Sequence, residues 1–186
     1  MSQLQQVRYT YVDLEAFPQG DGKRYEIIDG ELLVTPSPNV RHQAVLRELV
    51  WAVESHLREH PLGTLFFAPL DVVFADDSVV EPDLLYISKA RAERMTKKNI
   101  QGAPDLVVEV LSESTRRTDE VRKRKLFERY DVLEYWIVDP ELETVKVFRR
   151  KEARFERVAE LSLESLDALT TPLLPGFELP LGRIFG

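Results

Sequence analysis

The chain contains no cysteine, which excludes disulfide bonds and thiolate metal sites. Its three histidines, His42, His56 and His60, lack the acidic motif that accompanies a histidine pair in helical zinc sites. The eight glycines form no cluster, so a glycine-rich phosphate loop is missing, and no nucleophile-elbow motif supports a Ser-His-Asp triad. These absences argue against a zinc enzyme, a P-loop nucleotide hydrolase and a serine hydrolase.

Long apolar runs are missing as well. The longest, such as "DLVVEVL", are strand-length and fall well short of the roughly 20 residues that a membrane span needs. Residues 1–17 have neither a basic start nor an apolar block, so the sequence predicts no secretory signal. We therefore expect a cytoplasmic protein with no membrane contact, which the lack of cysteine also suits.

The chain has no excess of positive charge. With 25 basic and 32 acidic residues, its net charge is −7. A protein that grips nucleic acid over a broad surface usually carries a basic excess, so this balance argues against tight non-specific binding. It still allows an enzyme that contacts DNA or RNA through a local basic patch, or an acidic cleft that needs a divalent cation.

The 186 residues, 44% of them hydrophobic, predict a single domain over residues 1–186. Turn and periodicity signals predict a β-hairpin over about residues 25–35, centred on "DG", and an amphipathic helix in "NVRHQAVLRELVWAVESHLREH". Strands are predicted in "GTLFFAP", "LDVVFA", "EPDLLYIS", "PDLVVEVLS", "EYWIVDP", "TVKVFRR" and "RFERVAEL", and a second helix after "SESTRRTD". This order predicts a mixed α/β (α+β) fold with a central sheet flanked by helices and an N-terminal β-hairpin. We expect the apolar tail "TPLLPGFELPLGRIFG" to be irregular.

Two predicted strands begin alike, in "EPDLLYI" and "APDLVVEVL". Strand alternation puts Asp105 and Glu109 on one face of the second strand and an apolar row on the other. A glutamate in such a strand is costly unless it is paired or bound to a metal. If the two strands are neighbours, Asp83 and Glu109 can converge on a hard cation such as Mg²⁺. The alternative is that Asp83 and Asp105 cap turns and that Glu109 pairs with an arginine.

Two further acids lie in or beside predicted strands. Asp71 begins "DVVFADDS", and Glu26 lies on the hairpin beside Tyr25, from which it can reach the same cleft. Hairpin solubility explains Glu26 equally well.

The stretch "KRKLFERY" carries two lysines that differ in helical phase. At 100° per residue, Lys123 lies at the centre of an apolar stripe that includes Leu126 and Phe127, with Asp119 one turn earlier. Lys125 lies roughly 200° away, on the opposite face. An inward lysine needs a carboxylate partner, so Lys123 is predicted to face the acidic strands. Alternatively, its stem covers the core and its amine reaches water.

Several motifs, "YEIIDGELL", "RHQ", "EPDLLYIS", "GAPDLVVEVLS" and "EYWIVDP", together resemble the Uma-type family of bacterial restriction-endonuclease-like proteins over residues 11–149. That family is similar to the PD-(D/E)XK nuclease superfamily. The resemblance implies that Asp83, Glu109 and Lys123 are catalytic, and that Asp83 and Glu109 bind Mg²⁺ or Mn²⁺. The superfamily's lysine would fall at Leu111, and the resemblance places it at Lys123 instead. Further implied metal or supporting residues are Glu26, Asp71 and Asp105. Ser112, at the end of its strand, is a candidate to hydrogen-bond a ligand carboxylate, and a role as a simple cap explains it equally well.

The resemblance implies a metal-dependent endonuclease that hydrolyses phosphodiester bonds of DNA, with a homodimer as an option. The alternatives are a non-catalytic dimeric protein that keeps the nuclease fold to bind nucleic acid or a partner, and a hydrolase of small phosphate esters. The apolar "EYWIVDP" strand is a candidate dimer contact, although burial of Tyr135 and Trp136 in the core is the stronger expectation.

Overall fold

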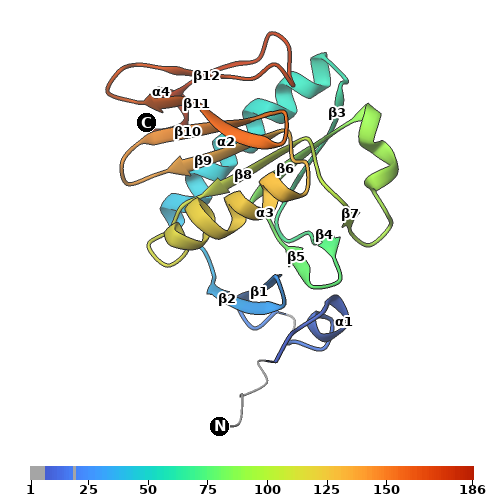
Figure 1. Cartoon of the computed structure of the whole chain (residues 1–186). Helices are drawn as coiled ribbons and strands as arrows, with labels where there is room; N and C mark the ends of the chain where they lie inside the picture. Colours follow the sequence, from blue (N-terminus) through green and yellow to red (C-terminus); the bar gives the residue numbers. More distant parts are fainter. Residues whose placement is uncertain (1–6, 19) are drawn as a thin grey trace.

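The computed structural model describes residues 7–18 and 20–186. The first six residues of the segment 1–17, for which no secretory signal is predicted, lie outside the described residues. Most of the chain folds around a six-stranded sheet (Figure 1), whose strand order is β11-β10-β9-β8-β6-β3. Its strands are β3 (Gly63–Phe67), β6 (Leu84–Ser88), β8 (Leu106–Val110), β9 (Glu134–Asp139), β10 (Thr144–Lys151) and β11 (Arg154–Ser162). Only the central β8 and β9 are parallel, so this sheet is mixed, as predicted.

A second sheet, in the order β2-β1-β5-β4-β7, contains the predicted hairpin. Its strands are β1 (Lys23–Ile28), β2 (Glu31–Pro36), β4 (Val72–Ala75), β5 (Ser78–Val80) and β7 (Ile100–Gln101). The hairpin turns at Asp29 and Gly30, both with positive φ (52° and 78°), which is the backbone that the two-residue "DG" turn requires. This sheet carries Arg24 and Glu26 of β1 to one end of the larger sheet.

Helices cover both faces of the six-stranded sheet (Figure 1). The long helix α2 (Val40–Glu59) packs its apolar stripe on the face formed by Leu84, Val108 and Trp136. A π-helical turn, η2 (Thr118–Lys123), leads into α3 (Arg124–Arg129), which packs on the other face. Because both faces are covered, all five residues of β8 are buried, including Glu109.

The C-terminal tail is more regular than expected. It contains a short strand, β13 (Glu178–Pro180), and a short helix, α4 (Leu181–Phe185). Strand β13 pairs with β12 (Ala168–Thr170), which lies just before the tail. The apolar side chains of the tail join the core on the α2 face, and this burial explains the ordered path. The remaining short elements are α1 (Tyr11–Leu14) and η1 (Lys89–Arg94).

The strand "EYWIVDP" is β9, and Tyr135 and Trp136 are fully buried, which confirms the expectation of core burial. Among the described residues, no helix is long and apolar enough to cross a membrane.

Candidate active site

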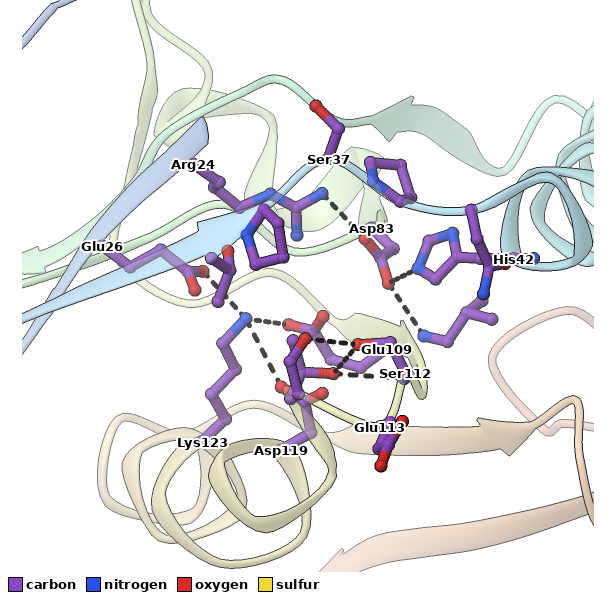
Figure 2. Close-up of a pocket in the computed structure, with 17 residues that line it drawn as sticks. Arg24, Glu26, Ser37, His42, Asp83, Glu109, Ser112, Glu113, Asp119 and Lys123 are labelled. Carbon is purple, nitrogen blue, oxygen red and sulfur yellow. Dashed lines mark hydrogen bonds and ion pairs between the residues drawn. The ribbon is translucent and has the colours of Figure 1, made fainter. Parts of the chain in front are cut away.

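A cavity of about 500 Å³ opens where β1, the start of β6, the end of β8, α2 and η2 meet. Figure 2 shows its charged side chains pointing toward one another from these separate elements. They are Arg24, Glu26, Asp83, Glu109, Asp119 and Lys123, with the imidazole of His42 beside Asp83, and Glu113 also lines the cavity. We name it the catalytic pocket for the role that the sequence predicts for it, and divide it into two halves. The aspartate half consists of Asp83, Arg24 and His42, and the lysine half consists of Lys123, Glu26, Glu109 and Asp119.

Strand direction explains why the two predicted carboxylates meet. Strands β6 and β8 are antiparallel neighbours with Leu84 opposite Val108, so the same register brings Asp83 beside Glu109. The condition on which the convergence of Asp83 and Glu109 depended, that their strands are neighbours, is therefore met. Asp105 immediately precedes β8 and so lies at its other end, about four residues or 13 Å from Glu109. There it accepts a hydrogen bond from the backbone N–H of Ser88 (2.7 Å).

Three donors hold Asp83 in the aspartate half. Arg24 donates from Nη2 to Oδ1 (2.9 Å), while the Nε2 of His42 (3.0 Å) and the backbone N–H of Val110 (2.9 Å) contact Oδ2. Burial disfavours the ionised carboxylate, but these donors outweigh it and lower the pKa of Asp83 to about 2. Asp83 is therefore a fixed anion at neutral pH.

Arg24 and His42 are functional candidates that sequence reasoning did not identify. Arg24 reaches Asp83 across 59 positions of sequence, a contact that no local pattern reveals. His42 was considered as a zinc ligand and quoted within the "RHQ" motif without a role, whereas it is buried and contacts Asp83. A local signal for His42 did exist. Asn39 is the N-cap of α2, so His42 lies in the first turn of the helix, at the end that borders the pocket.

Lys123 is the centre of the lysine half (Figure 2). Its Nζ lies 2.8 Å from Glu26, 2.8 Å from Glu109 and 3.6 Å from Asp119. Its side chain is 3% exposed, whereas Lys125 is exposed. The helical-phase prediction is confirmed, and the alternatives, an amine that reaches water and an arginine paired with Glu109, are wrong.

The protonation of this half follows from one cation among several acids. Burial disfavours the charged amine, yet Glu109, Glu26 and Asp119 outweigh it and raise the pKa of Lys123. Burial raises the pKa of Glu109 well above its usual range, and burial raises that of Asp119 to about 6 against the opposing effect of Lys123. Lys123 therefore carries its proton among these acids, where it donates hydrogen bonds and offsets their negative charge.

The other predicted site residues divide between the catalytic pocket and the rest of the molecule. Glu26 lies in the pocket, where it binds Lys123 and accepts from the backbone N–H of Glu81 (2.8 Å). Ser112 lines the pocket and its hydroxyl bonds that of Thr115 (3.0 Å). Asp71 lies outside the pocket, in a separate cavity. Asp105 also lies outside the pocket, at the far end of β8.

The donor chemistry of the pocket fits a hard divalent cation. Carboxylate oxygens are the ligands that Mg²⁺ and Mn²⁺ prefer, and the buried Oδ1 of Asp119 has no hydrogen-bond partner among residues 7–18 and 20–186. In that same part of the chain, no three histidine, aspartate or glutamate side chains stand in a ready-made ligand arrangement. Mg²⁺ commonly needs only one or two protein carboxylates, with water and substrate oxygens completing its shell.

Comparison with solved structures defines the class of fold. The chain superposes on a crystal structure from Anabaena variabilis, described as "a putative nuclease belonging to DUF820", with a TM-score of 0.77 and 22% identity, covering 95% of this chain and 97% of that one. The fold is therefore a restriction-endonuclease-like nuclease fold. The type IIG restriction endonuclease BpuSI aligns with a TM-score of 0.41 and 14% identity, over 67% of this chain and 14% of that one.

The sequence model of the Uma2 family, described as "Putative restriction endonuclease", matches residues 10–182. The chain belongs to the Uma2 family, as its motifs indicated. No curated protein matches the chain.

Proposed function

We propose that this protein is a divalent-metal-dependent endonuclease that hydrolyses phosphodiester bonds of DNA. The observation that carries the proposal is the convergence of Asp83, Glu109 and Lys123 in one pocket of a nuclease-like fold. Membership of a family described by restriction-endonuclease activity supports DNA as the substrate.

Asp83 and Glu109 would hold Mg²⁺ or Mn²⁺, which, when bound, lowers the pKa of a water molecule and neutralises charge on the phosphate. Arg24 and His42 keep Asp83 ionised and fix the direction of its oxygens. Lys123 would position the attacking water and donate to a phosphate oxygen as negative charge develops there. Glu26 and Asp119 position its amine for this role.

A second candidate is a protein that keeps this fold to bind nucleic acid or a partner without cleaving it. One observation favours it: Asp83 and Lys123 are fully paired inside the protein, so the pocket needs no cation to satisfy these two charges. The homodimer included in this alternative stays a prediction that size-exclusion chromatography tests.

Cleavage of supercoiled plasmid DNA separates the two candidates. The protein is incubated with plasmid in Mg²⁺, in Mn²⁺ and in EDTA, and nicked and linear products are measured on a gel. The proposal predicts cleavage in a metal buffer, none in EDTA, loss of cleavage in Lys123→Ala, and full activity in the matched surface variant Lys125→Ala. Binding of DNA without cleavage in either metal would support the second candidate.

A further inference from the structure

A second cavity, of about 410 Å³, lies beside the catalytic pocket. The two share Asn39, Ser112 and Glu113 as lining residues, so they adjoin, and we refer to them together as the groove. Figure 2 shows Ser112 and Glu113 on the side of the pocket away from Glu26. Beyond these shared residues, the second cavity is lined by Arg41 and Arg116. The groove thus runs from an acidic end to an end that holds two arginines.

Arg116 is fixed by a buried anion. Its Nη1 donates to Oδ2 of Asp139 (2.5 Å), whose own side chain is only 3% exposed. The other carboxylate oxygen of Asp139 accepts from the backbone N–H groups of Glu141 (3.1 Å) and Leu142 (3.2 Å). Arg116 is 36% exposed, and within the described residues its Nε and Nη2 have no partner. One edge of the guanidinium is therefore free for a ligand while its position is set from beneath.

Arg41 approaches the same cavity from the first turn of α2. Its Nη2 donates to the backbone carbonyl of Phe185 (3.0 Å) and to Glu143 (3.2 Å), and its side chain is 41% exposed. In the part of the chain that the structure describes, its Nε and Nη1 carry no partner. Two anchored guanidinium groups, each with spare donors, therefore line one cavity.

We propose that Arg41 and Arg116 form a phosphate subsite that binds the backbone phosphate next to the one cleaved in the catalytic pocket. This inference rests on the proposed nuclease function and names the residues that hold its substrate. A guanidinium offers paired donors that match phosphate oxygens, and anchoring reduces the entropy lost on binding. A chain of net charge −7 needs such a local basic element to hold nucleic acid beside four buried acids.

Glu113 and Glu141 also line this cavity. Their negative charges reduce the attraction of the cavity for phosphate, so we expect the subsite to bind a DNA backbone phosphate weakly. This gives the proposal a test of opposite sign: removal of Glu141's charge strengthens binding, whereas removal of either arginine weakens it.

The test measures binding of a short fluorescein-labelled DNA duplex by fluorescence anisotropy in EDTA, across a series of KCl concentrations, for wild type and variants. Arg41→Gln and Arg116→Gln should each weaken binding about 5-fold and reduce the salt slope by about 1, because each removes one phosphate contact. Glu141→Gln should tighten binding about 2-fold. The matched control is Arg58→Gln: Arg58 also lies on α2 and pairs with a glutamate, but it is seventeen residues, roughly 26 Å, further along that helix.

Thermal unfolding of each variant identifies loss of fold. If Arg116→Gln unfolds because Asp139 loses its partner, Arg41→Gln and Glu141→Gln still decide the proposal. The subsite would be overturned if binding and salt slope were unchanged in Arg41→Gln, or if Arg41→Gln and Arg58→Gln lost equal affinity. Plasmid cleavage by wild type would still uphold the nuclease function in that case. Wild-type protein that binds DNA without cleaving it overturns the function, and the variants still test the subsite. Wild-type protein that does not bind the duplex overturns the subsite.

Discussion

The two halves of the catalytic pocket ionise in opposite ways although both are buried. In the aspartate half, one carboxylate receives three donors, and the pKa of Asp83 falls to about 2. In the lysine half, three carboxylates share the single amine of Lys123, and burial raises the pKa values of Glu109 and Asp119. The ratio of donors to acids therefore sets the charge of each half, more than depth of burial does.

The difference gives the halves different roles. Asp83 is a permanent anion held by the protein, whereas the lysine half carries more acidic oxygen than Lys123 can satisfy. Paired carboxyl groups whose environments push their pKa values apart are a recurring feature of hydrolytic sites. In this pocket, the lysine half is the one that gains from additional positive charge.

The largest effect on stability is expected when Lys123 is removed. Lys123→Ala leaves Glu26, Glu109 and Asp119 buried without their cation, and breaking such a buried pair costs about 3–5 kcal/mol of unfolding free energy. Lys125→Ala, at an exposed position of the same helix, should change stability by less than about 0.5 kcal/mol. Urea denaturation measures both, and similar losses would contradict the burial of the Lys123 charge.

A smaller effect compares the two carboxylates directly. Asp83→Asn weakens the charged hydrogen bonds from Arg24 and His42, so we expect a loss of about 2–3 kcal/mol. Glu109→Gln removes a charge from the acid-rich half and keeps an oxygen for Lys123, so the loss should be about 1 kcal/mol or less. The same denaturation experiment checks this order. If Glu109→Gln were the more damaging change, the contrast between the halves would fail.

The smallest expected effect extends the comparison to the arginine end of the groove. Burial opposes ionisation of Asp139, but Arg116 and the backbone N–H groups of Leu142 and Glu141 outweigh it and lower its pKa below the usual 3.8. The carboxylate of Asp139 therefore takes up a proton more readily in the unfolded chain than in the folded one. The stabilisation that ionised Asp139 gives the fold is present above about pH 4 and is lost as the pH falls through the lower, folded-state pKa. Thermal unfolding against pH should show a shallower acid limb in Asp139→Asn than in wild type. An unchanged acid limb would show that Arg116 does not hold the carboxylate ionised.

Much of the site could be predicted because its signals are local. The apolar stripe placed Lys123 inward, and this held although η2 is a π-helical turn, because Asp119, Lys123 and Phe127 still face the sheet. Strand alternation singled out Glu109, and Asp83 was expected beside it if the two strands were neighbours. Strand direction was not readable, and since antiparallel pairing separates the two "PD" ends, Asp105 lies away from the pocket.

Contacts between distant segments account for what the sequence did not reveal. Arg24 reaches Asp83 from the hairpin, and His42 reaches it from α2, and neither pairing leaves a periodic pattern. The tail was expected to be irregular because its prolines interrupt any strand pattern, yet burial of side chains such as Phe177 and Leu181 gives it a defined path.

Calorimetric titration with Mn²⁺ tests the central claim most directly, with Asp83→Asn compared against Asp105→Asn, the matched change at the other buried "PD" aspartate. The account predicts one Mn²⁺ site in wild type, its loss in folded Asp83→Asn, and its retention in Asp105→Asn. Mn²⁺ binding that survives unchanged in Asp83→Asn would contradict a metal site in the catalytic pocket.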